Sequence, residues 1–155
     1  MAGVRKVHEQ SYLLRHEHMN GAGRLFGGTL MAWIDDIAGI AARSYSGRDV
    51  TTACVDHLNF LEGARLNDMI VLTAQVSYVG STSMEVTVKT WCEKLDGSRD
   101  LVNAAYLVMV AMDENGRPCP APAFTPETEA EKEEWEAAHQ RYLLRKERQK
   151  QERRR

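Results

Sequence analysis

The chain has 155 residues, of which 43% are hydrophobic and 27% charged, and its formal net charge is −2. This length and composition predict a single domain with its own core, and the small net charge argues against nucleic acid as a partner. No stretch approaches the roughly 20 consecutive apolar residues that span a bilayer, and no secretory signal pattern is recognisable, so we expect a cytoplasmic protein without a membrane contact.

Cysteines, histidines and serines show no pattern of a metal site, a disulfide or a nucleophile. The three cysteines are an odd number at unrelated spacings, and we expect them to be reduced packing residues: Cys54, Cys92 and Cys119. His16 and His18 stand two residues apart without a third ligand nearby, which predicts no metal site. No serine or cysteine stands in a nucleophile-elbow pattern, so serine-esterase chemistry is not expected.

The predicted elements begin with a short strand at 10–14 and a loop. A nearly all-apolar helix is then predicted from Gly28 or Thr29 to about Arg43, with Gly47 as its stop signal. Four strand-like runs follow, separated by turn residues, and they cover 51–61, 69–79, 83–95 and 101–112.

The apolar patterns within these runs indicate how each strand is covered. In the run 69–79, alternate residues are apolar and are predicted to share one face: Ile70, Leu72, Ala74, Val76 and Tyr78. The run 83–95 alternates in the same way. The run 101–112 is almost wholly apolar, so we expect a central strand that is covered on both sides.

This order of elements predicts an α+β fold, in which an antiparallel sheet wraps around one long apolar helix. A sheet covers only one side of such a helix, so we expect a second copy of the chain to cover the other. Four prolines fall between 118 and 126, where the composition changes. We therefore place a main domain at 8–118 and a proline-containing linker with a charged helical tail at 119–155.

The tail is strongly charged, with glutamates at its start and eight Lys/Arg against two Glu in residues 140–155. This composition is typical of a solvated or partly disordered terminal helix, and we expect its deletion to leave function largely intact. Trp135, Ala138 and Tyr142 stand at helical spacing, and they are the residues that could dock such a helix on the main domain.

The strongest functional signal is a glycine-rich loop that leads into the apolar helix, because that helix contains two carboxylates, Asp35 and Asp36. Their side chains point about 100° apart. Asp36 shares a polar stripe with Arg43, which predicts solvent contact or an ion pair. Asp35 is flanked by small and apolar residues that offer no partner for a buried charge, so we predict a functional carboxylate there.

The surrounding motif is Asn20-x-x-Gly23-x-x-Phe26-Gly27-Gly28, followed by Met31 and Asp35 in the helix. It resembles the hotdog-fold acyl-CoA thioesterases of the bacterial short-chain and mammalian brain acyl-CoA hydrolase type. Shorter matches extend the resemblance to roughly residues 10–118, and they lie at 55–60, 79–83 and 110–117. Two positions depart from the family pattern: Gly63 replaces a proline, and Asn67 replaces the glycine before Asp68.

The resemblance implies an enzyme with the hotdog fold that hydrolyses an acyl-CoA to a free acid and CoA. No metal or separate cofactor is implied, since CoA is part of the substrate. The resemblance assigns Asp35 the role of general base or nucleophile, and Asn20 an orienting role toward substrate or water. It also implies dimers that share the site between subunits, with three dimers in a hexamer, and substrate contacts by Phe26, Gly27, Gly28, Ser81, Thr82 and Ser83.

Two other functions stay open on the sequence. A non-catalytic acyl-CoA-binding sensor would keep the glycine-rich helix start but would need no acid at Asp35. A hydratase or dehydratase of the same fold would pair a histidine with the acid, and His16 and His18 are the nearby candidates. The cations that would hold the CoA phosphates are not ranked, and the candidates are Arg24, Arg48, Lys94 and Arg99.

Overall fold

The computed structural model describes residues 2–60 and 63–155, so the last residue of the predicted strand 51–61 lies outside the described residues. The elements in chain order are β1 (His8–Leu13), the short 3₁₀ helix η1 (His16–His18), α1 (Gly27–Ser46), β2 (Asp49–Phe60), β3 (Met69–Val79), β4 (Ser83–Glu93), β5 (Arg99–Met112) and α2 (Glu129–Arg153). Every predicted helix and strand is present, with ends that differ by a few residues.

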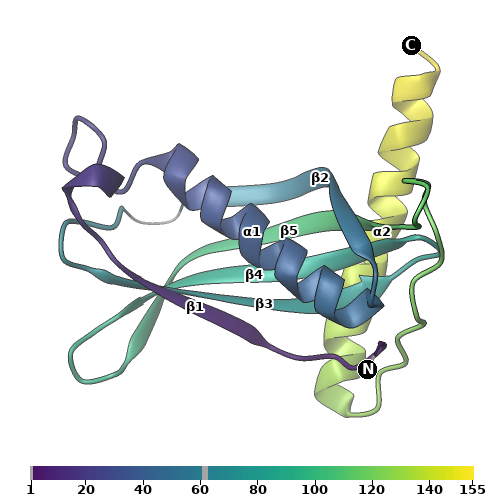
Figure 1. Ribbon diagram of the computed structural model, residues 1–155, viewed down its shortest axis with the longest axis horizontal. Coiled ribbons are helices and arrows are strands. Elements are labelled where there is room, and N and C mark those ends of the chain that lie inside the picture. The colour runs from purple at the N-terminus through teal and green to yellow at the C-terminus, as the bar shows by residue number, and fades with distance from the viewer. Residues whose placement is uncertain (1, 61–62) are drawn as a thin grey trace.

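The five strands form one sheet in the order β1-β3-β4-β5-β2, and all neighbouring strands are antiparallel. Figure 1 shows α1 in front of this sheet and α2 behind it. The predicted α+β fold, an antiparallel sheet around one long helix, is confirmed. β5 lies between β4 and β2, as its apolar sequence predicted.

The core fills the space between α1 and the facing side of the sheet. Its fully buried members from α1 are mostly aliphatic, and they meet alternate residues of the three central strands: Leu30, Ile34, Ile37, Ala38 and Ala42 against Leu72, Val86, Val88, Leu107 and Met109. Burial of a leucine- or isoleucine-sized side chain contributes about 1.5–3 kcal/mol, so this layer supplies most of the driving force for folding.

α1 ends where the sequence predicted a stop. Gly47 has a φ of 65°, a left-handed conformation that glycine adopts without strain, and its N–H donates to the carbonyl of Arg43 at 2.9 Å. The helix continues to Ser46 before this cap. No helix within residues 2–60 and 63–155 is both long and apolar enough to cross a bilayer.

A bulge in β3 corrects one predicted face. Val76 pairs with Val86 and Tyr78 pairs with Glu85, so Ser77 is an extra residue that reverses the alternation. The alternate residues before the bulge face the core as predicted: Ile70, Leu72, Ala74 and Val76. Tyr78 instead faces α2, where its ring lies 4.9–5.5 Å from three aromatic rings, those of Trp135, His139 and Tyr142.

The charged C-terminal segment is folded against the sheet and is not a solvated tail. α2 begins with a capping box in which the Thr128 hydroxyl accepts from the Glu131 N–H at 3.1 Å. Ala138 is fully buried, and Trp135 and Tyr142 dock on Tyr78, as their helical spacing allowed. The expectation of a solvated helix was wrong because it weighed composition alone, whereas several of these charges have partners on the sheet.

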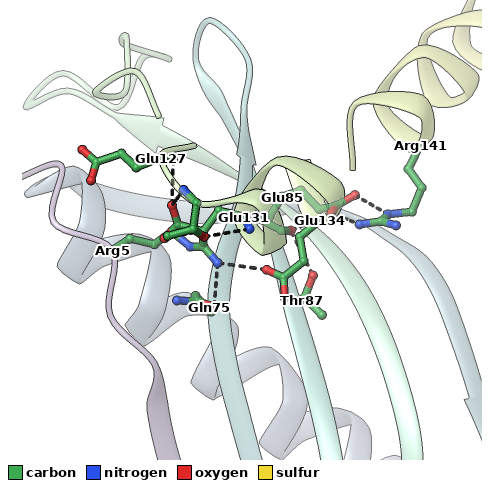
Figure 2. Close-up of polar contacts among 10 residues, drawn as sticks. Arg5, Gln75, Glu85, Thr87, Glu127, Glu131, Glu134 and Arg141 are labelled. Atoms are coloured by element: carbon green, nitrogen blue, oxygen red, sulfur yellow. Dashed lines mark hydrogen bonds and ion pairs between the residues drawn. The ribbon is translucent and has the colours of Figure 1, made fainter. Parts of the chain in front are cut away.

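The N-terminal segment ties α2 to the sheet as well. Figure 2 shows Arg5 between them: its Nη2 donates to Gln75 of β3 at 2.7 Å and to Glu134 of α2 at 3.1 Å. The same guanidinium lies 4.7 Å from the centre of the Phe124 ring, in the segment that leads to α2. Arg5 therefore connects α2, and the segment that leads to it, with β3 of the sheet.

Candidate active site

The start of α1 combines free backbone donors with aromatic rings. The first N–H groups of a helix have no partner within it, and here they belong to Gly27 and its neighbours. A Cβ on Gly28 would lie 2.7 Å from Cε1 of Phe26, and one on Gly27 would lie 3.5 Å from Cζ of Phe60. Both rings are about half exposed. The helix therefore presents amide donors beside an apolar surface, which suits the carbonyl of an acyl group.

Asp35 lies two turns further along α1, and its surroundings differ from the prediction. In the single chain it is exposed, and its Oδ1 accepts a hydrogen bond from the Thr52 hydroxyl of β2 at 2.6 Å. The sequence predicted a buried carboxylate without a local partner. Thr52 was missed because threonine is common in strands, and its contact with Asp35 exists only once β2 passes beside α1. Asp36 is exposed, as its polar stripe predicted.

Asn20 organises the loop before α1. Its Oδ1 accepts from the N–H groups of Ala22 at 2.9 Å and Arg24 at 3.1 Å, and its own N–H donates to the carbonyl of Arg24 at 2.7 Å. This arrangement closes a tight turn with the side-chain carbonyl. The amide nitrogen Nδ2 is the part of this side chain that the turn leaves available.

The predicted site residues do not come together within one chain. Gly27 and Asp35 are eight residues apart on α1, which is about 12 Å along the helix axis. Ser81 and Thr82 form the β3–β4 turn, and Ser83 begins β4, at the other end of α1, which is about 30 Å long. There the Ser81 carbonyl accepts from the N–H of Ala121 at 3.1 Å. Figure 1 shows α1 running between these two ends of the sheet.

The outward side of α1 and the neighbouring edge of the sheet are partly apolar and uncovered. Met31 and Ile40 of α1 are 45% and 43% exposed, and Val55 of β2 is 45% exposed. Within residues 2–60 and 63–155, β2 is also an edge strand, with β5 as its one neighbour in the sheet. An open edge beside exposed apolar side chains is typical of a surface that pairs with another chain.

His18 lies near α1 and its ring already has partners within the chain. His18 accepts from the N–H of Arg15 at 3.0 Å, and its ring meets Trp33 edge-on at 5.1 Å. Trp33 in turn stacks on Tyr12 at 3.9 Å. Among the residues that the structure describes, no three histidines, cysteines or carboxylates lie where they could share a metal ion.

Two of the predicted phosphate-binding cations are already paired. Lys94 lies 3.0 Å from Asp100, while Arg99 bonds Glu9 at 2.6 Å and Glu93 at 3.0 Å. Arg24, by contrast, stands in the loop directly before α1, next to the free amide donors. Arg48, the fourth candidate, follows the other end of α1, so Arg24 is the nearer of the two to these amide donors.

The fold defines a class of protein: it is the hotdog fold, in which the helix that the sheet surrounds carries Gly27, Gly28 and Asp35. A family model described as thioesterase superfamily matches residues 22–97. A Bacillus subtilis protein named uncharacterized acyl-CoA thioester hydrolase YkhA is 44% identical over 113 residues, which cover 72% of this chain and 66% of the relative. The rat cytosolic acyl coenzyme A thioester hydrolase is 32% identical over 124 residues, 78% of this chain.

Solved structures agree with these relatives. The acyl-CoA hydrolase of Staphylococcus aureus, in complex with butyryl coenzyme A, coenzyme A and coenzyme A disulfide, has a TM-score of 0.90 at 35% identity over 96% of this chain and 91% of its own. A hexameric acyl-CoA thioesterase has a TM-score of 0.85 at 38% identity, over 93% of this chain and 92% of its own. The chain belongs to the acyl-CoA thioester hydrolase family. It spans about two thirds of the Bacillus relative's length and 32% of the rat enzyme's.

Alanine variants of the Staphylococcus aureus enzyme have also been solved. The three replaced residues are an asparagine, an aspartate and a threonine, separated by 15 and 17 residues. Asn20, Asp35 and Thr52 have the same residue types and the same spacing.

Proposed function

We propose that this chain hydrolyses acyl-CoA thioesters to a free carboxylic acid and CoA, in the cytoplasm. The observation that carries the proposal is the Asp35 carboxylate, held at 2.6 Å by Thr52 on the outward side of α1. A hydrogen-bonded carboxylate on an open surface is available to a substrate, whereas one in a sealed core is not. The family membership and the residue spacing shared with the Staphylococcus aureus variants support the same assignment.

The site we propose is shared by two chains. The amide donors at the start of α1 lie about 12 Å from Asp35 of the same helix, too far for one thioester carbonyl to meet both. Two copies of α1 that pack antiparallel about a two-fold axis bring the start of one helix beside Asp35 of the other. The exposed apolar residues of α1 would then be covered. We further propose that three such dimers form a hexamer.

In this arrangement the N–H groups of Gly27 and Gly28 polarise the thioester carbonyl. Asp35 then removes a proton from a water molecule, whose oxygen attacks the carbonyl carbon; the C–S bond breaks and the thiolate of CoA takes up the proton. In the alternative route Asp35 itself attacks, and water hydrolyses the mixed anhydride. Thr52 orients the carboxylate in both routes, and the Nδ2 group of Asn20 orients the water or substrate.

The direct test is thiol release from a panel of acyl-CoAs of increasing chain length, detected with a thiol reagent. We expect turnover with at least one member of the panel. A protein that binds acyl-CoA without releasing thiol would instead be a sensor. Hydration of an enoyl-CoA without thiol release would indicate a hydratase.

Loss of the Thr52 hydroxyl should slow turnover. Thr52→Val keeps the shape of the side chain but removes the donor to Asp35, and a hydrogen bond to a charged group is worth about 1.5–3 kcal/mol, so we expect kcat to fall by about 10- to 100-fold. The measurement is steady-state thiol release. Thr51→Val, at the preceding and exposed position of the same strand, is the matched control and should keep kcat.

Sharing of the site between subunits can be tested by mixing two inactive chains. Asn20→Ala and Asp35→Asn remove residues that we place in opposite halves of one site, so a mixed dimer contains one intact site. After subunit exchange, verified by mass, we expect part of the wild-type thiol release to return. An inactive mixture would show that each chain holds a complete site.

A further inference from the structure

A buried network of charges lies between α2 and the sheet, on the side away from α1. Its centre is Glu85 of β4, whose side chain is completely buried. Arg141 donates to both of its oxygens, at 2.8 and 3.0 Å, and Figure 2 shows this pair. Arg145 donates at 2.8 Å and the Ser77 hydroxyl at 2.6 Å. Four hydrogen bonds therefore fix Glu85 in the middle of the sheet.

One atom of this network also reaches the edge of the sheet. Nη1 of Arg145 lies 2.8 Å from Glu85 and 3.0 Å from Oδ2 of Asp56 in β2. The side chains of Arg145 and Asp56 are only 8% and 7% exposed, and Arg148 bonds the other oxygen of Asp56. Burial raises the pKa of Asp56, but its bonds to Arg145 and Arg148 outweigh this and hold the pKa below its usual value.

The pairing of β2 with its neighbour is irregular. In the part of the chain that the structure describes, β5 is the one partner strand of β2, and the register shifts twice, between Thr52 and Cys54 and again between Val55 and His57. Asp56 is the unpaired residue of the second bulge. Bulges bend a strand and redirect its side chains, so the path of β2 depends on what holds the bulged residue.

Thr52 stands four residues before Asp56, on the side of β2 that faces α1, and it donates to Asp35. We infer that Glu85, Arg145 and Asp56 form a clamp that sets the position of Thr52 and, through it, the orientation of the Asp35 carboxylate. They are positioning residues for the hydrolysis. This role rests on the proposed function, because it takes Asp35 to be the carboxylate that acts in the hydrolysis. None of the three lies on the side of the sheet where Asp35 is held, so they act through β2.

The clamp can be separated from simple stabilisation by two matched variants. Arg145→Gln and Arg141→Gln each remove one guanidinium that bonds Glu85, and both arginines belong to α2. Of these two arginines, only Arg145 is also bonded to β2. We expect both variants to lower the melting temperature. A misplaced catalytic group costs up to about 100-fold in rate, and we expect Arg145→Gln to lower kcat by about 10-fold with KM nearly unchanged. Arg141→Gln should keep kcat within about two-fold.

Asp56→Asn provides a nearly isosteric second variant, which carries the test if Arg145→Gln does not fold. It should show the same loss of kcat. In combination with Thr52→Val, Asp56→Asn should add no further loss, because the clamp acts through Thr52. Additive losses in the double variant, or equal losses in Arg141→Gln and Arg145→Gln, would overturn the positioning role.

A structural measurement keeps this inference separate from the proposed function. In a crystal structure of Asp56→Asn we expect the distance between Thr52 Oγ1 and Asp35 Oδ1 to exceed 3.5 Å, the limit of a hydrogen bond, compared with 2.6 Å here. An unchanged distance would overturn the clamp. Absence of thiol release from the wild-type chain would instead overturn the proposed function, while the distance would still test the positioning.

Discussion

Replacing Asp35 by asparagine is expected to slow acyl-CoA hydrolysis by about 10²- to 10⁴-fold, the contribution usual for a general acid–base group. The change is nearly isosteric and still accepts the hydrogen bond from Thr52, so the chain should keep its fold. It removes the basic or nucleophilic oxygen that both proposed routes require. The measurement is kcat from thiol release, with circular dichroism and oligomer mass to verify that the protein is intact.

Asp36→Asn is the matched control for this experiment. Asp36 neighbours Asp35 on the same helix and is exposed like it, so the two variants remove the same charge from the same region. Their side chains point about 100° apart, and only Asp35 is bonded to Thr52. We expect Asp36→Asn to stay close to the wild-type rate. Equal damage from both variants would contradict the assignment of Asp35 as the catalytic carboxylate.

Deleting residues 127–155 is expected to destabilise the protein severely. Glu85 would lose both arginine partners, and the face of the sheet that α2 covers, including the Tyr78 ring, would be exposed to water. Exposure of each large buried apolar side chain costs about 1.5–3 kcal/mol. Asp56 and Tyr78 would lose their contacts with α2 as well. We expect the melting temperature to fall by about 10 °C or more, with loss of oligomer and of activity.

A shorter deletion tests whether contacts, rather than chain length, are responsible. Within the described residues, the side-chain bonds from α2 to the sheet end at Arg148. Removing only 149–155 should therefore leave the melting temperature and thiol release nearly unchanged.

The longer deletion has an outcome that would contradict our expectation. Full activity and oligomer mass after the deletion of 127–155 would support the predicted division into a self-sufficient unit at 8–118 and a separable tail at 119–155.

Local chemistry was sufficient to predict the elements and their order. The apolar run after Gly28 and the stop at Gly47 depend on helix propensity and on a left-handed glycine, which are properties of short segments. The alternating strands joined by short turns left an antiparallel sheet around one helix as the simplest arrangement. Asp35 could be singled out in the same way, because a carboxylate among apolar helix residues is unusual in any fold.

Contacts between distant segments could not be predicted in this way. The donor to Asp35 is Thr52, and nothing in the sequence of β2 distinguishes it from Thr51. Tyr78 changes face because of a bulge that arises only when β3 pairs with β4. The predicted burial of Asp35 failed for a related reason: its apolar neighbours line one side of α1, while the other side of the helix is open in the single chain.

The sequence by itself thus determined the fold class and the family, and it singled out Asp35 as the candidate carboxylate, because each of these inferences depends on residue type and short spacing. Only the tertiary structure decided the surroundings of that carboxylate and the role of the C-terminal segment. Arg145 meets Glu85 across 60 residues of sequence, and Arg148 meets Asp56 across 92. The buried carboxylates of Glu85 and Asp56 pair with arginines of α2 that look solvated in the sequence, and this pairing offsets the cost of desolvating the carboxylates.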